Sequence, residues 1–138
     1  MADDLSFDLH ALVARLDRSA DRLLSSEYGI SYRRFLALFM VRDLGATTQR
    51  ALAERLDISE PSVSRMTGVL AEEGLLGVKA DPDGGNRRRL ELTADGERVV
   101  KQCGEFLAGR FTELLNSAGV PRAEYARHTL MLLEALDD

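Results

Sequence analysis

Along most of the chain, apolar residues recur at steps of three and four positions, which is the spacing of an α-helix that buries one face. The first such stretch covers residues 5–27 and is followed by Gly29, a residue suited to a left-handed helix C-cap. A second stretch begins after Ser31, whose hydroxyl can cap a helix N-terminus, and ends near Gly45. The pattern therefore predicts two helices in the first third of the chain.

Two shorter helices are predicted next, separated by a tight joint. Thr48 can cap a third helix over residues 49–56, and Ser59 can cap a fourth, which would end at Gly74. Pro61 lies inside the first turn of the fourth helix, where its missing N–H costs little. Two capped helices at such a joint have the layout of a helix-turn-helix, in which the second helix can enter the major groove of DNA.

The period of the pattern then changes from helix to strand. Leu90 and Leu92 alternate with charged residues, as in a half-buried strand, and residues 76–80 are the expected partner strand. Between the two strands, residues 81–86 read DPDGGN and have the composition of a turn. We call residues 76–92, the two strands and their turn, the wing.

Two further helices are predicted after the wing. Thr93 can cap a long helix with Asp95 and Glu97 in its first turn, where the helix dipole favours negative charge. Residues 117–121 break this helix, and a last helix is expected over residues 122–136. The predicted fold class is mainly α (α+β): a winged helix-turn-helix with long N- and C-terminal helices.

Composition and charge limit the classes of protein that fit. The chain has 138 residues, and we expect one domain over residues 1–138. No apolar run approaches the roughly 20 residues that span a bilayer, and the acidic N-terminus does not resemble a signal peptide, so we expect a cytoplasmic protein without a membrane partner. The net charge of −5 argues mildly against nucleic acid, but residues 47–93 hold seven Lys and Arg against eight Asp and Glu and are the less acidic part. DNA binding would therefore depend on a few well-placed arginines.

The fourth predicted helix has two chemically different sides. Val63, Met66 and Leu70 would face the core. The opposite side carries small and polar residues that let a helix approach base edges, and Arg65 can fork onto a guanine or a phosphate. The expected DNA contacts of this helix are Ser59, Glu60, Pro61, Ser62, Ser64, Arg65 and Gly68. The alternative is an ordinary amphipathic helical hairpin with a solvated polar side.

Three successive arginines follow the turn of the wing. Alternation places Arg87 and Arg89 on the side opposite the two leucines of the strand, and Arg88 on the leucine side near the tip. At least one of them could enter a minor groove, where narrow A·T tracts attract arginine, although a solvated charged turn is the alternative. The remaining expected contacts are to phosphates, at the start of the third helix: Thr48, Gln49 and Arg50.

A set of residues spread over nearly the whole chain also has a familiar arrangement. Its members are Thr48, Leu52, Ala53, Leu56, Ile58, Ser59, Val63, Ser64, Arg65, Leu70, Gly74, Leu75, the arginines of the wing, Leu92, Thr93 and Gly96. In these residues the chain resembles the MarR family of winged helix-turn-helix transcriptional regulators. The resemblance implies a homodimer whose two lobes each read half of a pseudo-palindromic operator in double-stranded DNA. It also implies a repressor that releases DNA when a small-molecule effector or an oxidant acts near the helical junction.

The wing departs from the family pattern at one point. The family often carries an Asp-x-Arg near the wing tip, in which the Asp braces the Arg. In this chain the corresponding window falls on Gly84, Gly85 and Asn86, with Asp83 and Arg87 on either side. Which arginine would enter the minor groove is therefore left open.

The apolar residues outside the helix-turn-helix and wing favour a dimer. The helix over residues 5–27 and the segments within residues 94–136 carry more apolar surface than a small winged helix needs, and a second copy would bury it. We therefore assign residues 31–93 to a DNA-binding lobe and the other two ranges to dimerisation helices. The candidate walls of an effector pocket are Phe35, Phe39 and Met40, although each of them alone is more simply a core residue.

Other chemistry-bearing residues suggest no second site. Cys103 lies on the apolar stripe of the long helix, so we expect a buried, inert thiol. No His, Cys, Asp and Glu cluster has zinc spacing, and no nucleophile–base pair or cofactor loop is legible, so we expect no metal, no cofactor and no enzyme activity. The alternative to a DNA-binding regulator is a helical protein-interaction module that keeps the winged-helix fold without DNA binding, and the acidic balance favours it.

Overall fold

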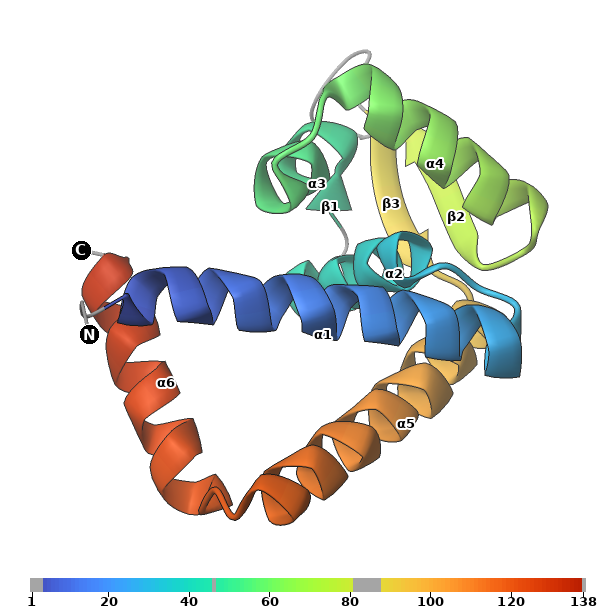
Figure 1. Ribbon diagram of the computed structural model, residues 1–138. Coiled ribbons are helices and arrows are strands. Elements are labelled where there is room, and N and C mark those ends of the chain that lie inside the picture. Colours follow the sequence, from blue (N-terminus) through green and yellow to red (C-terminus); the bar gives the residue numbers. More distant parts are fainter. Residues whose placement is uncertain (1–3, 46, 81–87, 138) are drawn as a thin grey trace. The chain divides into compact units, whose positions relative to one another are not determined.

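The computed structural model describes residues 4–45, 47–80 and 88–137. Every predicted helix and strand is present, and the predicted fold class, mainly α with a small antiparallel sheet, is confirmed (Figure 1). The elements are α1 (Leu5–Tyr28), α2 (Tyr32–Leu44), β1 (Thr47–Thr48), α3 (Gln49–Leu56), α4 (Glu60–Glu72), β2 (Leu76–Ala80), β3 (Arg88–Leu92), α5 (Ala94–Ala118) and α6 (Arg122–Leu136). Within the described residues, no helix is long and apolar enough to cross a bilayer.

The chain has two compact units, and α5 begins in the first and ends in the second. The first unit is Met1–Gly104 and contains the helix-turn-helix and the wing. The second unit is Glu105–Asp138. The division of the chain into a DNA-binding lobe and dimerisation helices stays a prediction.

Short-range hydrogen bonds set the helix ends where the sequence signals predicted them. The hydroxyls of Ser31, Thr48 and Ser59 each accept a hydrogen bond from the backbone N–H three residues later, at 3.2, 3.1 and 3.3 Å. Each bond satisfies one of the N–H groups that a helix start leaves without a partner. At the end of α1, Gly29 has φ 66°, a left-handed conformation that glycine adopts without strain.

The sheet has three strands in the order β1-β3-β2, all antiparallel. The two longer strands pair with Val78 opposite Leu90 and Lys79 opposite Arg89. β3 lies between its two neighbours, and Leu90 is fully buried. β1 was not predicted, because two threonines are too short a segment to show an alternating pattern.

The buried side of α4 differs from the prediction at one position. Val63 and Leu70 are fully buried, as expected, but the third fully buried residue of the helix is Thr67. Met66, expected in the core, is only half-buried and lines a surface cavity. Thr67 can take the interior position because its hydroxyl accepts a hydrogen bond from Gln49 and donates one to a backbone oxygen.

The junction between the wing and α5 requires a glycine. The hydroxyl of Thr93 accepts a hydrogen bond from the backbone N–H of Gly96 at 3.0 Å and donates one to the backbone oxygen of Gly74 at 2.6 Å. A Cβ atom on Gly96 would overlap the backbone oxygen of Leu75. The first turn of α5 can therefore approach the start of β2 only because residue 96 has no side chain.

The second unit has little interior of its own. One aromatic contact within it joins Phe111 of α5 to Tyr125 of α6, with ring centroids 6.2 Å apart. Leu115 is buried, whereas no described residue of α6 is. The exposed large apolar side chains of this unit are Leu114, Leu130, Met131, Leu132, Leu133 and Leu136.

Candidate nucleic-acid interface

The outward side of α4 is polar and exposed, as its sequence predicted. Glu60, Pro61, Ser64, Arg65 and Gly68 are all exposed, on a helix whose other side is fully buried. The helix packs against α3 and β2, so its orientation is set by the core of the first unit. Apart from Glu60 at the start of the helix and Arg65, the side chains on the outward side are small, and a helix with such a side can approach a surface closely.

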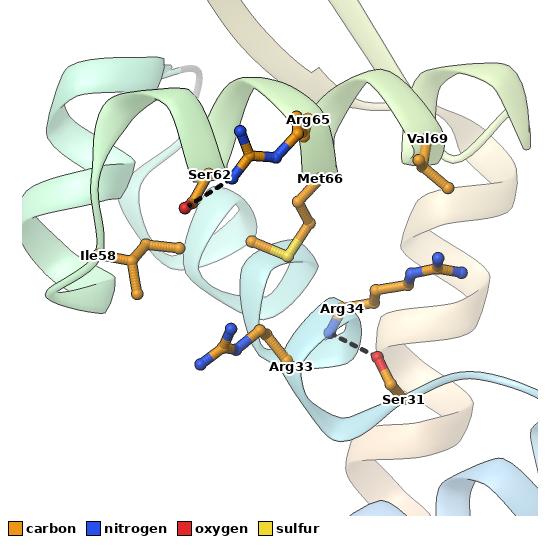
Figure 2. Close-up of a pocket in the computed structure, with 8 residues that line it drawn as sticks. All are labelled: Ser31, Arg33, Arg34, Ile58, Ser62, Arg65, Met66 and Val69. Carbon is orange, nitrogen blue, oxygen red and sulfur yellow. Dashed lines mark hydrogen bonds between the residues drawn. The ribbon is translucent and has the colours of Figure 1, made fainter.

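Hydrogen bonds connect the first turns of α4. The hydroxyl of Ser59 donates to Oγ of Ser62 at 2.9 Å, and Nη2 of Arg65 donates to the same oxygen at 3.3 Å (Figure 2). The hydroxyl groups of Ser59 and Ser62 therefore already take part in hydrogen bonds within the first turns of α4. Arg65 uses one of its five N–H donors for this contact and keeps the others available.

At the start of α3, the three predicted phosphate contacts have different surroundings. Thr48 caps the helix, and Nε2 of Gln49 donates to Oγ1 of Thr67 at 3.2 Å, so half-buried Gln49 faces α4. Arg50 is exposed, with Nε 3.6 Å from a carboxylate oxygen of Glu54. Arg50 is the one cation of the three and its side chain is exposed, and a DNA contact by any of the three stays a prediction.

Two arginines of the wing are described, Arg88 and Arg89, and both are exposed on β3. Arg87 lies outside the described residues, as does the turn in which the family's Asp-x-Arg window falls. On the neighbouring strand, Nζ of Lys79 lies 2.6 Å from Oε1 of Glu91. The hydrogen bond and the charge of Lys79 together hold the pKa of the Glu91 carboxyl below its ordinary value. The charge of Lys79 is thus neutralised within the wing, whereas neither described arginine has an ion-pair partner among the described residues.

A cavity of about 320 Å³ lies between the first turn of α2 and the outward side of α4. Its lining combines three arginines, two serine hydroxyls and the apolar side chains of Ile58, Met66 and Val69 (Figure 2). The arginines are Arg33 and Arg34 of α2 and Arg65 of α4, and the hydroxyls belong to Ser31 and Ser62. The sequence analysis predicted Ser62 and Arg65 as DNA contacts, but it did not single out Arg33 and Arg34.

A signal for those two arginines was present in the sequence. They occupy the first turn of α2, where the helix dipole disfavours positive charge, and that turn has no acidic residue. Among the described helices α3 also lacks an acidic residue there, whereas the first turns of α1, α4, α5 and α6 contain Asp or Glu. Two cations at an unfavourable position suggest a role other than helix stability.

The candidate effector-pocket residues do not line this cavity. Phe35 is buried, and Phe39 and Met40 are half-buried. The rings of Phe35 and Phe39 lie 6.0 Å apart between centroids, and the guanidinium of Arg42 lies 5.2 Å from the Phe39 centroid. Their role as walls of an effector pocket stays a prediction.

Cys103 is buried, as expected, and burial raises the pKa of its thiol. A raised pKa disfavours the reactive thiolate at neutral pH. Among the residues that the structure describes, no group of three or more His, Cys, Asp or Glu could hold a metal ion.

The α3–α4 pair followed by the wing defines a winged helix-turn-helix protein. Residues 28–89, from the last residue of α1 into β3, match the family model described as the MarR family. The match assigns this segment, which contains the helix-turn-helix, to the MarR family, and two relatives of the chain are named HTH-type transcriptional regulators.

Individual relatives agree with this assignment. An uncharacterised HTH-type transcriptional regulator of Bacillus subtilis, YhbI, is 23% identical over 121 residues, which cover 88% of this chain and 79% of the relative. A MarR family protein from Bacillus stearothermophilus has the same fold, with a TM-score of 0.83 at 20% identity over 98% of this chain and 94% of that one. A mutant of E. coli MarR complexed with operator DNA has a TM-score of 0.71 at 23% identity, over 94% of each chain.

Proposed function

We propose that this protein is a sequence-specific, double-stranded DNA-binding regulator in which α4 enters the major groove. The observation that carries the proposal is the division of α4 into an outward side of small, polar and cationic residues and an inward side that is fully buried. Ser64, Arg65 and Gly68 would contact base edges, with Ser59, Glu60, Pro61 and Ser62 near the backbone. The complex of a protein of the same fold with operator DNA supports this use of the fold.

The wing and α3 would add contacts beside the groove. Exposed Arg88 or Arg89, or Arg87 next to them, would enter the minor groove, and Thr48, Gln49 and Arg50 would face phosphates. Because the whole chain has a net charge of −5, affinity would depend on these few cations and not on overall attraction.

We further propose that the regulator acts as a homodimer on a pseudo-palindromic operator. On α1, the side chains of Leu5 and Phe7 are 62% and 72% exposed, and on α6, Leu136 is 81% exposed. On each of the two helices, exposed large apolar side chains mark a surface that another protein can cover. A second copy related by twofold symmetry would cover them and would present two α4 helices to successive half-sites.

The proposal extends to whether the protein represses or activates transcription and to what controls it. The regulator would be a repressor in the cytoplasm, where it meets its DNA, and a small-molecule effector would release it. An effector that alters the spacing of the two lobes would misplace both α4 helices together, and specific binding exceeds non-specific binding by only about 4–10 kcal/mol. Phe35, Phe39 and Met40 remain the candidate walls of the effector pocket.

Selection of DNA from a random-sequence pool tests the proposed function. The protein should enrich a sequence with two related half-sites, and gel shifts with that duplex should weaken as salt rises from low to moderate concentration. Retention of no DNA at any salt concentration would instead support the protein-interaction module, the candidate that the acidic composition favours.

A further inference from the structure

The cavity beside α4 has a cationic rim that the described residues neutralise only in part. Three guanidinium groups border it, and the carboxylate of Glu73 pairs with only one of them, with an oxygen 3.2 Å from Nη1 of Arg34. Within the described part of the chain, exposed Arg33 has no hydrogen bond or ion pair from its side chain. In a chain with a net charge of −5, this is a local excess of positive charge that suits an anion.

The floor of the same cavity is apolar. Met66 reaches from α4 toward α2, and Ile58 lies on the side of the joint between α3 and α4 (Figure 2). Ser31 and Ser62 also line the cavity. The occupant that fits is therefore anionic at one end and carries C–H groups at the other, a description that applies to a phosphodiester attached to deoxyribose.

The place of the cavity agrees with such an occupant. The major groove is about 12 Å wide and an α-helix with its side chains measures roughly 10–12 Å across, so the two DNA backbones pass close on either side of an inserted helix. The cavity lies immediately beside α4 and shares Ser62 and Arg65 with its outward side. A backbone that borders the groove would reach this point.

We propose that the cavity between α2 and α4 holds one sugar–phosphate unit of the DNA backbone, with Arg33 on the phosphate and Met66 and Ile58 against the deoxyribose. The proposal rests on the proposed function and adds to it a contact from α2 that is independent of base sequence. In this arrangement Arg65 on α4 contacts bases, whereas the phosphate contact of Arg33 sets how deeply α4 enters the major groove.

A salt series on Arg33→Ala tests the proposal. Dissociation constants are measured for the duplex selected by the wild-type protein and for a random-sequence duplex. Loss of one phosphate contact should make the slope of log K against log salt shallower by about 0.9 on both duplexes and leave the preference between them unchanged. Arg33→Lys, which keeps the charge, should retain most of the wild-type slope.

The matched control is Arg42→Ala, which removes an equal charge from an exposed position in the last turn of α2. Its slope should equal that of the wild-type protein. An Arg33→Ala slope that also equals the wild-type slope would overturn the backbone contact while leaving the proposed function intact. A wild-type protein that binds no duplex would overturn both.

A free carboxylate has the same chemistry as the proposed occupant, so a second measurement separates the two. Sodium benzoate is added to the DNA-free protein at constant ionic strength, and the thermal midpoint is recorded. A rise in midpoint that Arg33→Ala abolishes, together with an unchanged salt slope, would assign the cavity to a free anion and overturn the proposal. A shallower slope for Arg33→Ala supports the DNA backbone as the occupant whether or not benzoate has an effect.

Discussion

Nε2 of Gln49 donates a hydrogen bond of 3.2 Å to Oγ1 of Thr67, which joins the start of α3 to the buried side of α4. Oγ1 of Thr67 in turn donates to the backbone oxygen of Ser64 at 3.3 Å. Ser64 and the next residue, Arg65, belong to the side of α4 proposed to read bases. The first hydrogen bond therefore connects the two helices of the helix-turn-helix, and the second continues from it, within α4, to the side proposed to read bases.

Thr67→Val should lower the free energy of unfolding by about 1 kcal/mol, because it keeps the shape of the residue and removes both hydrogen bonds. Urea denaturation measures the change. Thr129→Val is the matched control, since the Thr129 hydroxyl also donates to a backbone oxygen one turn earlier but is exposed. A double-mutant cycle with Gln49→Ala should give a coupling of about 0.5–1.5 kcal/mol. Purely additive changes would show that the pair does not hold α3 to α4.

Gly96→Ala should destabilise the protein by about 1–3 kcal/mol or more, because the new methyl group meets the backbone oxygen of Leu75 and not a flexible side chain. Gly109→Ala on the same helix is the control. An alanine there would have no atom within 4 Å of its Cβ among the described residues, and it should stabilise the helix by up to about 1 kcal/mol. Opposite signs in thermal or urea denaturation are the expected result, and equal effects would contradict the close approach at residue 96.

The helices could be predicted from the sequence because local signals set their ends. Contacts between elements could not be predicted in this way. Ser31, Thr48 and Ser59 cap their helices within three residues, so their neighbours in the sequence were enough to predict the helix starts. The burial of Thr67 depends on Gln49, eighteen positions away, and helical spacing alone favoured the more apolar Met66.

The same distinction applies to the candidate site. The outward side of α4 could be predicted because one helix contains it. The cavity beside α4 could not, because it forms only where the first turn of α2 comes next to that side. Arg33 is distant in sequence from Arg65, and no spacing rule relates the two.

The proposed dimer predicts that charge on α6 will separate the two copies. Leu132 and Leu136 lie one turn apart, 60% and 81% exposed, and Leu132→Glu with Leu136→Glu would force carboxylates into the apolar contact. The protein should elute as a monomer in size-exclusion chromatography with light scattering and keep its helical circular dichroism. Arg127→Glu, at an exposed position on the opposite side of the same helix, should remain dimeric. An unchanged mass for the double variant would exclude this side of α6 from the interface.

The Lys79–Glu91 ion pair predicts a small, pH-dependent contribution to wing stability. The pKa of Glu91 is lowered in the folded protein, so the pair stabilises the fold above the ordinary carboxyl value of 4.5 and loses this effect as the pH falls through the lowered pKa. Lys79→Ala should therefore reduce the thermal midpoint slightly at neutral pH and have no effect in strong acid. Arg98→Ala, which breaks the exposed pair with Asp95, indicates the size expected for an ordinary surface pair. A Lys79→Ala effect that persists in strong acid would assign it to packing.

The wing predicts a loss of DNA affinity when its arginines are removed together. Arg87→Ala, Arg88→Ala and Arg89→Ala in one variant should weaken binding to the selected duplex at least about tenfold, because exposed arginines are the contacts that a wing can offer to a minor groove. The mass of the dimer should not change. Lys79→Ala is the matched control within the wing, since Glu91 already neutralises that charge, and it should bind DNA nearly as well as the wild-type protein. If the triple variant binds with wild-type affinity, the wing does not touch DNA and the arginines form only a solvated turn; if Lys79→Ala is equally weak, the loss reflects overall charge and not a specific contact.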